Sequence, residues 1–215
     1  MPSIFTRAVH AGERLAPMSN HKPVTTPIHP GVAFVTSDAD ELDAILDRTQ
    51  DGYVYRRYQN PTTDAFTQAM AALEGGPRSL AYASGMAAIH GALLAAGVRA
   101  GSQVMAARDC YGATYTLLSQ LLHSQGVTTH FVDITQTAAV AAQLADIRPV
   151  ALLCETISNP LLKVADVPAL TAAAHAVGAA VIVDSTFTTP YLCQPMAWGV
   201  DFVVHSITKY IGGHD

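Results

Sequence analysis

The sequence contains 215 residues, of which 50% are hydrophobic and only 13% are charged, and its formal net charge is −5. This length suits one large α/β domain, and the low share of charged residues predicts that much of the surface contacts other protein, in an oligomer or a further domain. Because the basic residues form no block that could neutralise a run of phosphates, we expect no nucleic-acid partner.

Cysteine spacing and apolar runs argue against two further classes of protein. The three cysteines are far apart and form no C-x-x-C pair, so we expect a reducing compartment and no metal site. The N-terminus lacks the apolar core of a signal peptide, and no uninterrupted apolar run reaches about 18 residues. We therefore expect a cytoplasmic protein with no membrane partner.

The first part of the chain differs in composition from the rest. Residues 1–60 are rich in Pro, His, Thr and Tyr and contain one helix-like pattern, at 37–49. This predicts an extended arm with a short helix, and we expect the arm to pack on something outside itself. A helix is then predicted from Asn60, a capping residue followed by Pro61, to a stop at Gly75 and Gly76.

Strand-like and helix-like segments alternate after this helix. This alternation predicts a mostly parallel sheet with helices on both faces, a three-layer α/β/α fold in which the apolar strands are buried on both sides. The strand-like segments are 78–83, 102–107, 129–133, 150–154, 179–184 and 201–205, and the helix-like segments are 85–97, 112–126, 137–147 and 167–178.

Polar residues follow five of these predicted strands. In an open α/β sheet, ligands bind at the carboxyl ends of the strands, so we expect these residues to form one site. They are Ser84, Gly85 and Met86, then Tyr111, then Glu155 with Asn159, then Asp184, and finally Ser206, Thr208 and Lys209.

Two of these residues have opposite charges. Asp184 ends an apolar run, where a carboxylate is costly to desolvate unless a cation or a hydrogen-bond donor lies next to it. That partner could belong to a ligand, but it is equally possible that Asp184 only caps a helix or accepts a hydrogen bond within a loop. Lys209 is by default a surface lysine, but a lysine at a buried strand end can lose its proton and form a Schiff base.

The other residues suit a phosphate and a flat ring. Ser84 begins a predicted helix whose backbone N–H groups could bind phosphate, although for Ser84 taken alone an ordinary N-cap is the better explanation. The Tyr111 ring could stack on a flat ligand or fill the core. One ligand suits all of these residues if it has an aldehyde for Lys209, a basic ring nitrogen for Asp184, a phosphate and a flat ring. Pyridoxal phosphate is such a molecule.

Two other enzyme classes use similar sheets. A dinucleotide-dependent oxidoreductase needs G-x-G-x-x-G after its first strand, and the sequence has none. An esterase needs G-x-S-x-G, but Ser84 lies in YASGM, without the outer glycines. Neither class is favoured.

Six motifs occur in order along the chain: YVYRRYQNPT at 53–62, ASGMAAIHG at 83–91, DCYGATY at 109–115, ETISNPLLKVADV at 155–167, VDSTFTTPYLCQP at 183–195 and GVDFVVHSITKYIGGH at 199–214. Together they resemble the Cys/Met-metabolism family of pyridoxal-phosphate enzymes, which includes cystathionine γ-synthase, cystathionine γ-lyase and methionine γ-lyase. The resemblance implies the fold type I, aspartate aminotransferase-like large domain at 61–215, incomplete at its C-terminus, and an arm at 1–60 that contacts the neighbouring subunit. We expect the family's C-terminal domain to be missing from this chain.

The resemblance also implies a role for each site residue. Lys209 would bind pyridoxal phosphate covalently and later move protons, while Tyr111 would stack on the ring and exchange protons with the substrate. Asp184 would contact the ring nitrogen, with Thr186 near it. The remaining implied contacts are Gly85, Met86, Ser206 and Thr208 to the phosphate, Asn159 near Glu155 to the ring hydroxyl, and Tyr55 and Arg57 to the phosphate of the adjacent subunit.

The reaction is less sharply implied than the cofactor. The segments SNPLLKVADV, GMAAIH and DCYG look most like cystathionine γ-synthase, which implies γ-replacement or γ-elimination on homoserine esters or cystathionine. Val54 stands where cystathionine enzymes often have an acid, and Ala113 where methionine γ-lyases often have Cys. Methionine γ-lyase and O-acylhomoserine sulfhydrylase stay open as alternatives, as does a truncated, inactive relative that only oligomerises. The resemblance implies a homo-oligomer with paired active sites, and we expect a tetramer.

Overall fold

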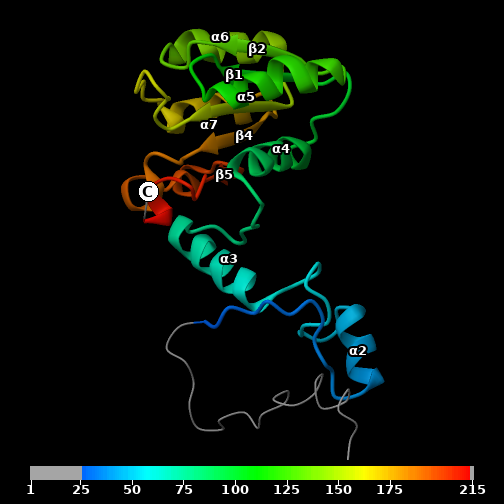
Figure 1. Cartoon of the computed structure of the whole chain (residues 1–215). Helices are drawn as coiled ribbons and strands as arrows, with labels where there is room; N and C mark the ends of the chain where they lie inside the picture. The colour runs from blue at the N-terminus through cyan, green and yellow to red at the C-terminus, as the bar shows by residue number, and fades with distance from the viewer. Residues whose placement is uncertain (1–25, 214–215) are drawn as a thin grey trace, which may run out of the picture. The chain divides into compact units, whose positions relative to one another are not determined.

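The computed structural model describes residues 26–213, and the chain divides into two compact units, Met1–Ala65 and Phe66–Asp215 (Figure 1). The division falls within helix α3 (Pro61–Glu74). The first 25 residues of the predicted arm, and the last two residues of the chain, lie outside the described residues.

The smaller unit has local structure in the part that is described. Helix α2 (Ala39–Leu46) lies within the predicted segment, and the Asp38 carboxylate caps it by accepting the Glu41 N–H at 2.8 Å. An antiparallel bridge joins Ala33 to Tyr55. The short helix predicted in the arm is therefore confirmed, and the chain around it is folded back on itself.

Helix α3 begins and ends as its sequence predicts. Asn60 Oδ1 accepts the Thr62 N–H at 3.0 Å, and Pro61 occupies the first helical position, where no amide hydrogen is needed. The helix ends at Glu74, and Gly75 follows with φ +69°, a left-handed conformation that costs glycine little.

The larger unit contains a sheet of five parallel strands in the order β2-β1-β3-β4-β5, which confirms the predicted parallel sheet. The strands are short apolar runs because both faces of the sheet are covered, and every residue of β3 is buried. Their bounds are β1 Gln103–Ala107, β2 Thr128–Val132, β3 Ala151–Glu155, β4 Ala180–Asp184 and β5 Phe202–Val204.

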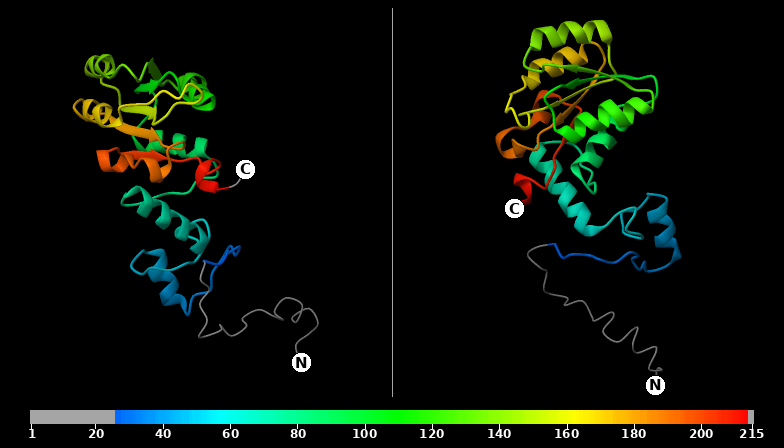
Figure 2. Two further views of the ribbon diagram at one scale, coloured as in Figure 1. Left: turned by 90° about the vertical axis from the view of Figure 1, so that its left-hand side faces the viewer. Right: turned by 45° about the horizontal axis from the view of Figure 1, so that its top comes forward.

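Helices cover both faces of this sheet, so the predicted three layers are confirmed (Figure 2). Successive strand residues point to opposite faces: Leu152 packs in the core under α6 and α7, whereas Leu153 packs in the core under α4 and η1. The helices are α4 Gly85–Ala95, α5 Gly112–Thr116, the π-helical η1 Leu117–Leu122, α6 Thr137–Ile147, α7 Val167–His175, α8 Thr189–Leu192 and the 3₁₀ turns η2 Pro195–Trp198 and η3 Tyr210–Gly212.

One predicted strand is wrong. Residues 78–83 form no strand, and Leu80 and Tyr82 within them are 70% and 47% exposed. A strand needs a hydrogen-bonded neighbour, but β5 ends the sheet, and no strand of the described chain pairs with 78–83. Apolar composition alone therefore misled the prediction.

The described chain lacks two features, a membrane-spanning helix and a cluster of metal-binding side chains. No helix within residues 26–213 combines the length and the apolar character needed to cross a membrane. Within the same residues, no three His, Cys, Asp or Glu side chains gather where they could hold a metal ion.

Candidate functional site

The predicted site residues meet at the carboxyl edge of the sheet. Strands β3 and β4 pair so that Glu155 lies beside Asp184, each at the end of its strand. The loop after β1 leads to Tyr111, and the turn after β5 leads to Lys209. Because parallel strands end at the same edge, segments far apart in the sequence are brought together there.

A cavity of about 260 Å³ opens at this edge. Its lining includes every predicted site residue of the larger unit: Ser84, Gly85, Met86, Tyr111, Glu155, Asn159, Asp184, Thr186, Ser206, Thr208 and Lys209.

Asp184 contributes a largely buried carboxyl group to the cavity. Its Oδ1 accepts hydrogen bonds from the Thr186 N–H at 3.0 Å and from the Thr186 hydroxyl at 2.5 Å. Burial raises the pKa of Asp184, while the Thr186 donors and the nearby His205 act in the opposite direction. The loop-acceptor alternative therefore holds for Oδ1, but Oδ2 has no donor among the described residues and can accept a hydrogen bond from a ligand.

Glu155 joins two loops of the site. Its Oε1 accepts the Tyr111 N–H at 2.6 Å, and its Oε2 accepts the Asn159 N–H at 3.1 Å. Burial, with a smaller effect of the Asp184 charge, raises the pKa of Glu155 to about 7 against the pull of these two N–H groups. One carboxyl group thus holds both loops and titrates near neutral pH.

The start of α4 packs closely on the turn after β5. A Cβ built on Gly85 would lie 2.8 Å from the Ser206 Cβ, so only glycine fits there. The Ser206 N–H donates to Thr186 Oγ1 at 2.8 Å. Ser84 Oγ accepts the Ala87 N–H at 3.1 Å, so the N-cap alternative for Ser84 is confirmed.

Lys209 and Tyr111 are accessible from the cavity. Tyr111 is 49% exposed, which excludes the alternative that its ring fills the core. Lys209 is exposed as well, so burial does not distinguish it from an ordinary surface lysine. What distinguishes it is its place on the lining of the same cavity as Asp184.

Tyr55 and Arg57 belong to the smaller unit and contact one another there. The Arg57 guanidinium carbon lies 5.2 Å from the centre of the Tyr55 ring and 5.4 Å from that of Tyr58. Such stacking holds a cation over aromatic rings. These two residues are not part of the cavity lining in the larger unit.

Sequence analysis missed three apolar residues of the lining, Ile89, Ile157 and Phe187. The Phe187 ring packs edge-on against Tyr210, with 6.1 Å between the ring centres. Apolar side chains offer no chemical signal of a site, although all three lie within the quoted motifs.

Comparison with known proteins decides the family. The model of the Cys/Met metabolism PLP-dependent enzymes matches residues 5–215. The chain belongs to this family. The resemblance inferred from the motifs is thus confirmed, and pyridoxal phosphate, the predicted cofactor, is the cofactor on which the family depends.

Two curated relatives match along the whole chain under different names. The O-acetyl-L-homoserine sulfhydrylase of Leptospira meyeri is 37% identical over 100% of this chain and 48% of its own length. The cystathionine β-lyase of Lactococcus lactis subsp. cremoris is 36% identical over 100% of this chain and 53% of its own length. The chain therefore spans about half the length of these relatives, and their names agree on the family but not on the reaction.

A solved structure supports the same fold. An enzyme structure from Campylobacter jejuni has a TM-score of 0.81 and 32% identity, and the match covers 89% of this chain and 47% of that one. That structure contains pyridoxyl-lysine phosphate. The described sheet and helices therefore have the fold type I architecture that was predicted.

Proposed function

We propose that this chain is the cofactor-binding part of a pyridoxal-phosphate enzyme that catalyses γ-replacement or γ-elimination on homoserine esters, cystathionine or related sulfur amino acids. The observation that supports it is the shared cavity: the Lys209 amine and the Asp184 carboxyl group line one space of about 260 Å³ at the carboxyl edge of the sheet. We propose this activity for the protein at the full length of its relatives, which are about twice as long as this chain.

The residues present fit pyridoxal phosphate. A phosphate needs backbone N–H groups and hydroxyls, and the N-terminus of α4 lies against Ser206 at a spacing that excludes any side chain on Gly85. A ring nitrogen needs an acceptor, and Asp184 Oδ2 is available to it. An aldehyde needs an amine, and Lys209 lines the same cavity.

The chain's own residues then have distinct tasks. When bound, pyridoxal phosphate withdraws electrons from the amino acid and so permits departure of a β or γ group. Lys209 would bind the cofactor and afterwards move a proton between neighbouring substrate carbons. Asp184, in its ionised form, would hold a proton on the ring nitrogen, because an opposite charge nearby raises the pKa of a base.

Tyr111 and Asn159 would orient the ring. Tyr111 is free to stack on it because half of its surface is exposed, and its hydroxyl would exchange a proton with the leaving group. Asn159 would donate to the ring hydroxyl. Glu155 would keep both residues in place through their backbone N–H groups.

We extend the proposal to the assembly. Residues 1–60 would form an arm on a neighbouring subunit, with Tyr55 and Arg57 at the phosphate of that subunit, and residues 61–215 the cofactor-binding domain. The guanidinium of Arg57 suits a phosphate because it donates in a planar fork. We further propose that the protein is a homo-oligomer with paired active sites, and that this oligomer is a tetramer. We propose a cytoplasmic location for it.

Absorbance spectroscopy tests the cofactor. Purified protein that has been mixed with pyridoxal phosphate and then freed of unbound cofactor should keep a visible band that borohydride abolishes, and Lys209→Ala should lack that band although it folds. A protein that is colourless once unbound cofactor has been removed would instead favour an inactive, oligomerising relative.

Product analysis tests the reaction. The protein, at the full length of its relatives, should be assayed in parallel with an O-acylhomoserine plus a thiol, with cystathionine and with methionine. We expect the new thioether from the ester, or 2-oxobutyrate from cystathionine. Pyruvate from cystathionine would show β-elimination and would overturn the γ assignment.

A further inference from the structure

A buried pair of hydrogen-bonded polar side chains, Glu74 and His205, lies beside the cofactor cavity but does not line it. Glu74 Oε1 and His205 Nε2 are 2.5 Å apart, and their side chains are only 8% and 4% exposed. Glu74 ends α3 and His205 follows β5, so the pair joins segments that are 131 residues apart in the sequence. Neither residue binds the cofactor or moves a proton in the proposed function, although His205 acts to lower the pKa of Asp184.

Two features of this pair reduce what it contributes to folding stability. A carboxylate at the C-terminal end of a helix faces the negative end of the helix dipole. Glu74 Oε2 and His205 Nδ1 are also buried without a hydrogen-bond partner among the described residues. A buried pair of this kind is often no better for folding than two apolar side chains, so its position suggests another task.

His205 begins the turn that contains three of the proposed cofactor contacts. The next residue, Ser206, donates its N–H to Thr186 Oγ1, and Thr186 in turn donates to Asp184. The Lys209 N–H donates to the Ser206 carbonyl at 3.2 Å. A displacement of His205 would therefore move this turn, defined as residues 205–209, relative to Asp184.

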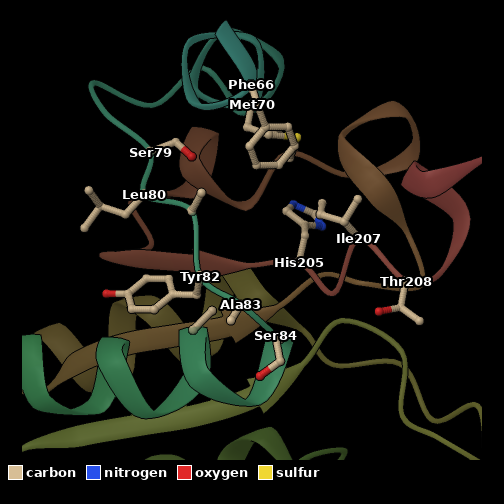
Figure 3. Close-up of a pocket in the computed structure, with 13 residues that line it drawn as sticks. Phe66, Met70, Ser79, Leu80, Tyr82, Ala83, Ser84, His205, Ile207 and Thr208 are labelled. Carbon is tan, nitrogen blue, oxygen red and sulfur yellow. The ribbon is translucent and has the colours of Figure 1, made fainter. Parts of the chain in front are cut away.

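The turn has open space on two sides. One side borders the cofactor cavity, and the other borders a second cavity of about 170 Å³ between the turn, α3 and residues 79–84 (Figure 3). Figure 3 shows the His205 ring pointing toward Phe66 and Met70 of α3, while Thr208 lies further along the same segment. The turn packs closely on Gly85 at Ser206, but the space on its two sides leaves room for the rest of it to move, so a polar connection at His205 has more effect there.

The end of α3 that carries Glu74 is held in place by other contacts. Gln194 Nε2 donates to the Leu73 carbonyl at 2.6 Å, which ties the last turn of α3 to the segment between α8 and η2. Gly76 follows the helix, and a Cβ built on it would lie 3.7 Å from the Met196 Cγ of η2, so the chain after α3 runs close to η2. Glu74 is thus presented from a fixed helix end.

We propose that Glu74 and His205 are a positioning pair, which holds the 205–209 turn so that Ser206, Thr208 and Lys209 face the cofactor cavity. The pair acts through the turn and touches no reacting atom. This inference rests on the proposed function, because the purpose of the turn is cofactor binding.

The first test uses the cofactor-free chain. Hydrogen–deuterium exchange of a peptide covering the 205–209 turn should be faster in His205→Leu and in Glu74→Met than in wild type. His175→Leu is the matched control, since it breaks the exposed His175–Asp201 pair, which is 2.8 Å long, on the same unit. Exchange as slow as wild type in both pair variants would overturn the proposal.

The second test measures the Kd for pyridoxal phosphate by absorbance titration, on variants whose circular dichroism matches wild type. We expect Kd to rise about tenfold in His205→Leu and in Glu74→Met, and by no more in the double variant, because both remove one connection. His205→Gln keeps a donor toward Glu74 and should restore Kd to within about threefold of wild type.

Two results would decide against the pair. Faster exchange with Kd within about twofold of wild type would show that the pair orders the turn without serving the cofactor. Additive losses in the double variant would show two independent structural defects. If wild type itself bound no pyridoxal phosphate, the proposed function would fall, whereas the exchange comparison would still decide whether the pair orders the turn.

Discussion

Glu155 offers the sharpest test of the site's electrostatics, through the substitution Glu155→Gln. The carboxyl group is 8% exposed and its pKa is raised from 4.5 to about 7, first by burial and then by Asp184. Gln has nearly the same shape but does not ionise. The variant therefore isolates the cost of holding a negative charge at this strand end.

Proton linkage gives the direction and the size of the effect that Glu155 has on the free energy of unfolding. Between pH 4.5 and about 7 the folded state keeps a proton on Glu155 that the unfolded state has lost, so stability falls as pH rises through this window. A shift of about 2.5 pKa units corresponds to about 3 kcal/mol, and most of it is expressed between about pH 5 and pH 8. Relative to wild type, Glu155→Gln should gain about 2 to 3 kcal/mol between these pH values.

Urea unfolding of the cofactor-free protein measures this gain. Trp198 is the single tryptophan of the chain and lies in the larger unit, so its fluorescence reports on the unit that contains Glu155. The free energy of unfolding of wild type and variant is compared at each pH. The Gln side chain would turn its NH2 group toward either the Tyr111 or the Asn159 N–H and so lose one hydrogen bond. This loss is the same at every pH, so it does not affect how the difference between variant and wild type changes with pH.

A control variant separates this effect from general charge removal. Asp146→Asn removes an exposed carboxylate from α6, and its free energy of unfolding should run parallel to that of wild type. The reasoning is refuted if Glu155→Gln also runs parallel to wild type from pH 5 to pH 8, because Glu155 would then titrate alike in the folded and unfolded states.

Further substitutions test other parts of the structure. Gly85→Ala places a Cβ 2.8 Å from Ser206 Cβ and should raise the Kd for pyridoxal phosphate about tenfold in an absorbance titration; an unchanged Kd would contradict the close packing. Leu152→Ala empties a fully buried position and should lower the free energy of urea unfolding by about 2 to 5 kcal/mol, and a loss below about 1 kcal/mol would argue against the core described. Asn60→Ala removes the side-chain cap of α3 and the donor to the His29 carbonyl and should cost about 1 to 2 kcal/mol in thermal unfolding, and a loss below about 0.5 kcal/mol would contradict the cap.

The sequence by itself determined the layers and the candidate site residues. Apolar strands that alternate with helices leave few arrangements other than a covered parallel sheet, because each element must bury its apolar face. Polar residues that directly follow such strands must then lie at one edge, since parallel strands all end on the same side. For this reason the sequence alone places Asp184 and Lys209 at one candidate site.

Only the tertiary structure decided which apolar segments pair and which polar groups meet. Residues 78–83 have a strand-like composition but no strand beside them, and pairing depends on a neighbour that local sequence does not specify. Glu74 and His205 appear ordinary in the sequence, yet they form a buried pair across 131 residues. Burial and long-range contact arise only when the chain is packed, so the raised pKa of Glu155 and the partner of His205 were decided by the fold.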